Sequence, residues 1–154
     1  MKVAILWLIN EKGEILLSQR AAHRSTDASM WGPSVSGKVD EGEDAEQAAV
    51  REANEELGID PMEVILLHHL HDSTHNHSDG RLREFSLFST HVKSVLIDKM
   101  KLESNEVAAV KWISLQNLQK EYEQNPETVI ISSDKDLWQE IFENLRRTIG
   151  YSTN

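Results

Sequence analysis

Three glutamates stand close together in one short segment of the chain. Glu52, Glu55 and Glu56 follow directly after Arg51. If the segment is helical, at about 100° per residue, the three carboxylates lie within an arc of about 100° on one side. Like charges at this spacing repel one another and destabilise a helix unless a cation accompanies them. The cluster therefore predicts a site for a hard divalent cation, the kind of ion that handles phosphate groups.

The residues around the glutamates predict a helix with one buried face. Asp44 followed by Gln47 resembles a capping box, and Gly58 is a natural stop just past the last turn. The side of this helix away from the glutamates is small and apolar, which predicts packing against a sheet. The residues on that side are Ala49, Val50, Ala53 and Leu57.

The spacing over residues 37–59 resembles the signature box of the Nudix hydrolase family. The matching positions are Gly37, Glu43, Arg51, Glu52, Glu55, Glu56 and Gly58, with Ile59 in the terminal apolar slot. Ala53 fills the other apolar slot with a smaller residue than usual. Seven fixed positions give a chance match on the order of 10⁻⁸ per start site at average composition. A merely solvated acidic helix would not account for the flanking glycines and the arginine.

The resemblance implies that the box binds metal ions. Glu52 and Glu56, one turn apart, are expected to hold one cation, and Glu55 to bind a second cation or to orient the attacking water. The backbone carbonyl of Gly37 or Lys38 is implied as a further oxygen ligand. Such ligands suit Mg²⁺, with Mn²⁺ as the alternative.

Arg51 has two partners within reach, Glu55 one turn later and Glu43 upstream. We expect its guanidinium to hold these carboxylates in place rather than to touch the substrate. The expected catalytic residues are Glu43, Arg51, Glu52 and Glu55.

The residues before the box resemble the isopentenyl diphosphate isomerase branch of the same superfamily. Residues 30–39 read MWGPSVSGKV, and residues 18–21 read SQRA. The isomerases carry a catalytic cysteine and a metal-binding histidine where this chain has Ser36 and Lys38. A serine hydroxyl is too weak an acid to protonate an alkene, and a protonated lysine cannot bind a metal. Mg²⁺-dependent hydrolysis of a diphosphate is therefore expected, with an isomerase and a non-catalytic Nudix binding domain as alternatives.

Further candidates lie outside the box. Arg20 is expected to contact a substrate phosphate, because a guanidinium matches phosphate bidentately. Lys38 and Trp31 are the other candidates for substrate binding. Glu84 matches a strand glutamate that binds metal in the isomerases, and Glu106 is its rival. The organic half of the substrate stays open, since loops at residues 21–31 and 72–81 would select it.

Five histidines fall within ten residues: His68, His69, His71, His75 and His77. One interpretation is a transition-metal or phosphate site. The other is a polar strand end followed by a flexible loop. We expect the second, because the spacing matches no fixed metal geometry and the chain has no thiolate.

Composition limits the remaining possibilities. With 154 residues and 39% hydrophobic residues, a single domain over residues 1–154 is expected. No apolar run approaches the roughly 18 residues of a membrane span, and the absence of cysteine is consistent with a cytoplasmic protein. A net charge of −10 argues against binding to a nucleic-acid backbone. We expect a small-molecule diphosphate as partner and leave a homodimer open.

Hydrophobic patterning completes the expected architecture. Strands are expected at residues 3–9, 14–20, 35–39, 62–71, 82–92 and 107–113, with the first two forming a hairpin. Besides the box helix, helices are expected after Ser114 to about residue 124 and at residues 134–149. A mixed sheet with helices on both sides is an α/β/α sandwich, the fold that the Nudix resemblance also implies.

Overall fold

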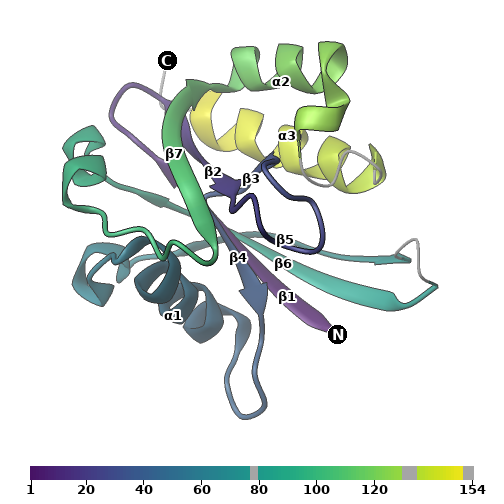
Figure 1. Ribbon diagram of the computed structural model, residues 1–154, viewed down its shortest axis with the longest axis horizontal. Helices are drawn as coiled ribbons and strands as arrows, with labels where there is room; N and C mark the ends of the chain where they lie inside the picture. The colour runs from purple at the N-terminus through teal and green to yellow at the C-terminus, as the bar shows by residue number, and fades with distance from the viewer. Residues whose placement is uncertain (77–79, 130–134, 151–154) are drawn as a thin grey trace.

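The protein is a mixed β-sheet with helices on both faces (Figure 1). The computed structural model describes residues 1–76, 80–129 and 135–150. Its strands are β1 (Lys2–Ile9), β2 (Glu14–Arg20), β3 (Trp31–Gly32), β4 (Val35–Lys38), β5 (His68–Asn76), β6 (Leu82–His91) and β7 (Val107–Ser114). Its α-helices are α1 (Ala45–Leu57), α2 (Leu115–Gln124) and α3 (Lys135–Gly150), and its short 3-10 helices are η1 (Pro61–Val64), η2 (Ser94–Lys99) and η3 (Pro126–Thr128). Helix α1 covers one face, and α2 and α3 cover the other. The predicted α/β/α sandwich is confirmed.

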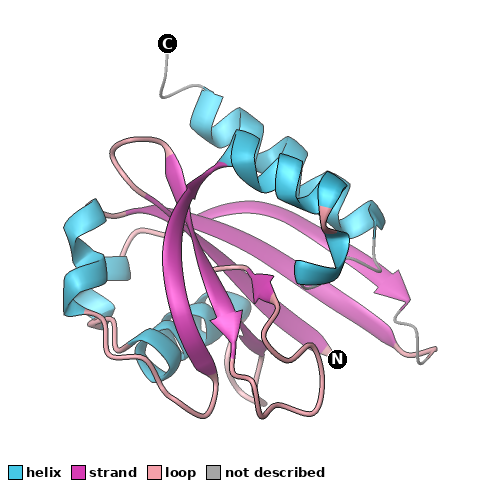
Figure 2. Cartoon of the chain, turned by 45° about the horizontal axis from the view of Figure 1, so that its top comes forward, coloured by secondary structure: helices cyan, strands magenta, loops and turns pink. Residues whose placement is uncertain are grey.

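Strand β1 is central to the sheet. It pairs in parallel with β6 along its whole length, from Lys2 beside Glu84 to Ile9 beside His91. Its other edge pairs antiparallel with β4. Strand β2 meets β1 only at Ile9 opposite Ile15 and then diverges to pair with β7 and β3 (Figure 2). The predicted hairpin is therefore present, but its ladder is short.

Ser34 fills the gap where β1 and β2 diverge. Its hydroxyl donates to the Leu16 carbonyl at 2.6 Å and accepts from the Leu8 N–H at 2.9 Å. Its own carbonyl accepts from the Ser18 hydroxyl at 2.7 Å. Ser34 is fully buried, so these bonds satisfy backbone groups that would otherwise lack partners. They also fix the segment that leads into β4 and brings Gly37 to α1.

Helix α1 begins and ends as its sequence predicts. Asp44 accepts from the Gln47 N–H, and the Gln47 side chain accepts from the Asp44 N–H, which completes a capping box. Gly58 ends the helix in the left-handed conformation, with φ 65°. The buried residues are Ala48, Ala49, Ala53 and Leu57. They pack with apolar residues of β1, β2 and β6, and the box glutamates lie outside this apolar cluster.

The strand predicted at residues 62–71 is wrong in its position. Pro61 opens the 3-10 helix η1, because Asp60 caps it by accepting from the Met62 N–H and proline suits a first helical position. Strand β5 starts only at His68 and runs on to Asn76, paired with β6. Much of the loop predicted at residues 72–81 is therefore strand.

One further boundary differs from expectation, and another cannot be compared. The loop predicted over residues 21–31 contributes the two-residue strand β3 at its end. The C-terminal helix is described from Lys135, and its predicted start at residue 134 lies outside the described residues. One side of this helix is apolar and buried, with Trp138 in an edge-on contact with Trp7 at 6.2 Å between ring centroids.

Candidate metal and diphosphate site

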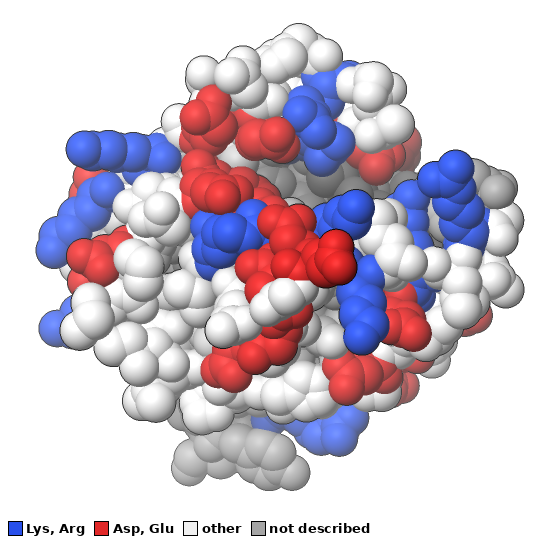
Figure 3. Space-filling model, turned by 90° about the horizontal axis from the view of Figure 1, so that it is seen from below, with Lys and Arg blue, Asp and Glu red and all other residues white. Residues whose placement is uncertain are grey.

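Arg51 binds carboxylates from the turn before α1 and from α1 itself. Its guanidinium donates to Glu43 Oε1 at 2.7 Å and Oε2 at 3.1 Å, to Glu52 at 2.9 Å and to Glu55 at 3.1 Å. It also donates to the Lys38 carbonyl at 3.0 Å. Both partners expected from the sequence are therefore bound at once. Figure 3 shows the face that carries α1, where acidic and basic side chains gather together.

Asp40 belongs to the same cluster and was not among the sequence candidates. Its carboxylate lies 3.4 Å from Arg51 Nη2, and its N–H donates to Glu43 Oε1 at 2.8 Å. The hydrogen bond from Arg51, followed by that from Asp40, holds the pKa of Glu43 below its ordinary value. Glu43 therefore stays ionised and anchors the guanidinium. The position of Asp40, shortly after β4 and before the box helix, is the signal that could have identified it.

Glu52 lies directly against Gly37. A Cβ built on Gly37 would overlap the Glu52 side chain, so only glycine allows this approach. Gly37 is paired with Ala4 of β1, which places it on the sheet face that α1 covers. The glycine that opens the box thus has a steric role in the structure.

Glu56 shares this confined space with Glu52. Burial raises the pKa of Glu56 to about 9, together with a hydrogen bond to Glu52 and the charges of Glu52 and Glu106. The positive charge of Arg20 acts in the opposite direction. Near neutral pH, Glu56 therefore carries a proton in the absence of a cation.

The end of β2 and the start of β7 bring further charges to Glu56. Arg20 acts on Glu56 electrostatically, and its own side chain donates to the Thr26 carbonyl at 2.7 Å. Glu106 raises the pKa of Glu56 and accepts from Arg24 at 3.0 Å. Glu106 therefore lies near enough to Glu56 to influence its ionisation, and Arg24, which the sequence did not single out, is its partner.

Glu84 has a different environment. Its side chain is 53% exposed and lies 4.0 Å from Lys2 Nζ at the start of β1. The ion-pair partner of Glu84 therefore belongs to β1 and not to the box. Of the two rivals, Glu106 has the stronger structural support.

The remaining candidates for substrate binding point away from the carboxylates. Lys38 is exposed and contributes its carbonyl to Arg51. Strand alternation places Ser36 and Lys38 on the sheet face opposite to Gly37. Trp31 lies on that opposite face too, within the core that α3 covers, with Lys111 Nζ 4.1 Å from its ring centroid.

The histidine-rich segment begins as the predicted polar strand end, but the strand continues to Asn76, where a flexible loop was expected. His71 and His75 of β5 face Glu140 of α3, at 3.8 and 3.1 Å, and His69 lies 2.8 Å from Asp72. The fifth histidine, at position 77, falls outside the described residues. Within the described ranges, no three His, Asp or Glu side chains are arranged to hold a metal ion as they stand. That statement includes the box, where Arg51 binds the carboxylates of Glu43, Glu52 and Glu55.

The described helices contain no stretch that is long and apolar enough to cross a membrane.

Comparison with known proteins identifies the family that the chain resembles. Residues 1–132 match the model of the NUDIX domain. An uncharacterized Nudix hydrolase from Listeria innocua is 28% identical over 112 residues, which cover 73% of this chain and 62% of that protein. An isopentenyl-diphosphate Delta-isomerase from Salmonella heidelberg is 26% identical over 116 residues, which cover 74% of this chain and 62% of the relative. The chain thus matches less than two thirds of the length of these relatives.

A solved structure of similar fold agrees with the sequence match. The crystal structure of a MutT protein from Methanosarcina mazei superimposes with a TM-score of 0.70 at 24% identity, covering 96% of this chain and 94% of that one. The box geometry, the mixed sheet and the match over residues 1–132 agree, and the chain belongs to the Nudix family.

Proposed function

We propose that the chain is a divalent-cation-dependent pyrophosphohydrolase. Its substrate would be a nucleoside diphosphate derivative or a related organic pyrophosphate, cleaved at the diphosphate linkage. The observation that carries this proposal is the confined pair Glu52 and Glu56, which needs a positive charge between its carboxylates. Nudix proteins typically use a divalent metal, and a cation could take the place of the proton on Glu56. The donor set fits Mg²⁺ or Mn²⁺, because it consists of oxygen atoms.

Each residue of the site would have a separate role in the reaction. Glu52, Glu56 and the Gly37 carbonyl would hold the cation, and Glu55 would bind a second cation or orient water. The bound cation would neutralise the diphosphate and lower the pKa of a coordinated water. Arg51 fixes the directions of Glu43, Glu52 and Glu55.

Glu106 and Arg20 extend the site beyond the box. Glu106 lies close enough to Glu56 to raise its pKa, which suits it to accept a proton from water or to act as a metal ligand. Arg20 supplies positive charge at the same place, and a guanidinium suits the phosphate oxygens of a substrate. These roles agree with a site that attracts an anion to a chain of net charge −10.

A substrate panel tests the proposal. Nucleoside di- and triphosphates, nucleotide sugars, dinucleotides and prenyl diphosphates would be incubated with and without Mg²⁺, with release of phosphate or nucleoside monophosphate as the readout. We expect Mg²⁺-dependent release from at least one class. Glu56→Gln should abolish it, and Glu46→Gln, the same change at an exposed position of α1, should not. Binding of a diphosphate without any turnover would instead support a non-catalytic Nudix domain.

An isomerase is the second candidate, because of the similarity to the Salmonella enzyme. Ser36 argues against it, since a hydroxyl cannot supply the acid that alkene protonation needs. Incubation with isopentenyl diphosphate followed by product analysis decides between the two. Formation of the dimethylallyl isomer that is lost in Ser36→Ala would replace the hydrolase by the isomerase.

A further inference from the structure

The segment at residues 101–106 runs from η2 to β7 and lies against the C-terminal end of α1 (Figure 1). The Lys101 N–H donates to the Leu57 carbonyl at 2.9 Å. The Glu103 N–H donates to the Glu56 carbonyl, also at 2.9 Å. A helix leaves its last carbonyls without partners of its own, so the 101–106 segment satisfies them and fixes the backbone of Glu56.

The same segment carries Glu106 and fixes it at two places. The Glu106 N–H donates to the Glu103 carbonyl at 2.9 Å, and the Val107 N–H donates to the same carbonyl at 2.8 Å. Glu103 therefore connects the backbones of Glu56 and Glu106 through one hydrogen bond on each side. The Glu106 carboxylate is held separately, because it accepts from Arg24 at 3.0 Å. These contacts agree with the effect of the Glu106 charge on the pKa of Glu56.

Gly58 allows the 101–106 segment to come this close to α1. A Cβ built on Gly58 would lie 2.9 Å from both the Cβ and the carbonyl oxygen of Lys101, and 3.0 Å from its nitrogen. Two of these three atoms belong to the backbone, so a side-chain rotation could not relieve the overlap. Either the end of α1 or the segment would have to move. Glycine is thus required here for close approach as well as for its left-handed conformation.

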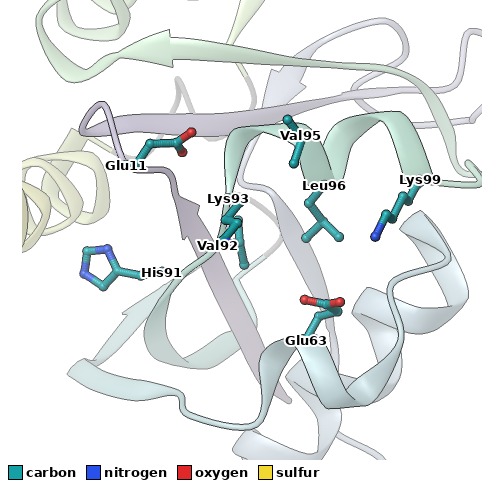
Figure 4. A pocket seen from close by; sticks show the side chains of 8 residues that line it. All are labelled: Glu11, Glu63, His91, Val92, Lys93, Val95, Leu96 and Lys99. Carbon is teal, nitrogen blue, oxygen red and sulfur yellow. The ribbon is translucent and has the colours of Figure 1, made fainter.

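The element before the segment is packed less closely against its neighbour. Helix η2 faces η1 across a pocket of about 550 Å³. Figure 4 shows Glu63 of η1 pointing toward Leu96 and Lys99 of η2 across this pocket. Side chains that line an open space lack close partners on that side. The position of the segment relative to α1 therefore depends on the backbone contacts beside Gly58.

We propose that Gly58 and the 101–106 segment position the Glu106 carboxylate beside Glu56, where both act on the cation. The inference rests on the proposed function, in which Glu106 binds the cation or accepts a proton from water. Gly58 touches neither the cation nor the substrate, so it is a positioning residue. Its effect on the site passes through Lys101 and Glu103 to Glu106.

Replacing Gly58 by alanine tests this role. Gly58→Ala should lower the Mg²⁺ affinity measured by calorimetry, and the turnover number, each by about 10-fold, because a carboxylate of the site is displaced. Gly13→Ala is the matched control. Gly13 also has a left-handed conformation, with φ 75°, but the nearest atom to an added Cβ is an Ile149 methyl at an ordinary 3.4 Å. The control should lose stability for the same backbone reason and keep Mg²⁺ affinity and turnover within about two-fold of wild type.

A second pair of variants tests the contact without changing Gly58. Lys101→Pro removes the N–H that binds the Leu57 carbonyl, and Met100 already has ψ 141°, which suits a residue before proline. Lys101→Ala keeps the N–H and is the control at the same position. We expect Lys101→Pro to behave like Gly58→Ala, and Lys101→Ala to behave like wild type.

Hydrogen exchange measures the contact independently of catalysis. The amide of Glu103 should exchange about 10-fold faster in Gly58→Ala and in Lys101→Pro, because the segment opens more often from α1. Gly13→Ala corrects for the loss of overall stability. Faster exchange of equal size in that control would mean that Gly58 has no specific hold on the segment.

Glu106→Gln decides whether the effect passes through Glu106. In that background, Gly58→Ala should change Mg²⁺ affinity and turnover by less than about two-fold, because the carboxylate that it displaces is already absent. An undiminished effect in the Glu106→Gln background, or wild-type exchange and Mg²⁺ affinity in Gly58→Ala, would overturn the proposal. A chain that bound Mg²⁺ but hydrolysed no diphosphate would refute the proposed function, while the Mg²⁺ affinities would still decide this inference. A wild-type chain that bound no Mg²⁺ would overturn both.

Discussion

Replacing Arg51 by lysine tests how the box is held together. Arg51 makes five hydrogen bonds, four to carboxylates and one to the Lys38 carbonyl. An ammonium group has only three donors, so at least two bonds must be lost. A hydrogen bond to a charged group contributes about 1.5 kcal/mol at the low end of the usual range. That lower value applies because the Arg51 side chain is 29% exposed and water can replace part of each bond.

The expected loss is therefore about 3 kcal/mol in the free energy of unfolding. With a urea slope of about 2 kcal/mol per molar, the midpoint should fall by about 1.5 M. Arg147→Lys, at an exposed position in the last turn of α3, is the control and should change stability by less than about 0.5 kcal/mol.

The same variant should weaken turnover or metal binding by about 10- to 100-fold, because the carboxylates lose their orientation. Titrations that vary Mg²⁺ and substrate independently measure this. If Arg51→Lys kept wild-type stability, the five bonds would contribute little and the reasoning would be refuted. An increase in the substrate Michaelis constant alone would make Arg51 a substrate ligand.

Further outcomes follow from Glu56 and from Gly37. The folded, metal-free chain keeps a proton on Glu56 that the unfolded chain releases, because the pKa is raised from 4.5 to about 9. Its unfolding free energy should therefore fall as pH rises between these values, by at most about 1.4 kcal/mol per pH unit, as urea titrations in a chelator would measure. Glu56→Gln retains a donor toward Glu52, so this contribution to the pH slope should disappear while turnover falls by roughly 10²-fold or more; an unchanged slope would place the proton elsewhere. Gly37→Ala should displace Glu52 and weaken Mg²⁺ binding measured by calorimetry, with binding of wild-type strength contradicting the close approach.

The sequence was sufficient for the elements that carry strong local signals. The capping box at Asp44 and the stop at Gly58 are present as predicted. The predicted apolar face of α1 is confirmed at Ala49, Ala53 and Leu57, whereas Val50 is only partly buried and Ala48 is buried as well. Each depends on contacts within a few residues, so a single chain contains the information. The pairing of Arg51 with Glu43 and Glu55 was foreseeable for the same reason.

What the sequence could not supply are the contacts set by the sheet. The apolar run around Ile65 and Leu66 reads as a buried strand, yet both side chains are exposed, because Pro61 opens a helical turn first. The polar segment from His68 onward forms the strand instead, because it pairs with β6. The nearness of Glu106 to Glu56 depends on where β7 begins relative to α1, which no local pattern records.

The strand pairing around β1 affects how the chain folds during its synthesis. Strand β1 touches its neighbour in sequence, β2, at a single pair, whereas its full-length partner β6 begins at Leu82 and ends at His91. During synthesis, the hydrogen bonds between β1 and β6 can therefore form only after β6 has been made. Contacts between residues so far apart in sequence slow folding, and the edge of β1 that β6 later covers stays unpaired and prone to aggregate in the meantime. We expect ribosome-bound chains that stop before β6 to depend on chaperones, and chains released with β6 complete to collapse into the sheet in one cooperative step.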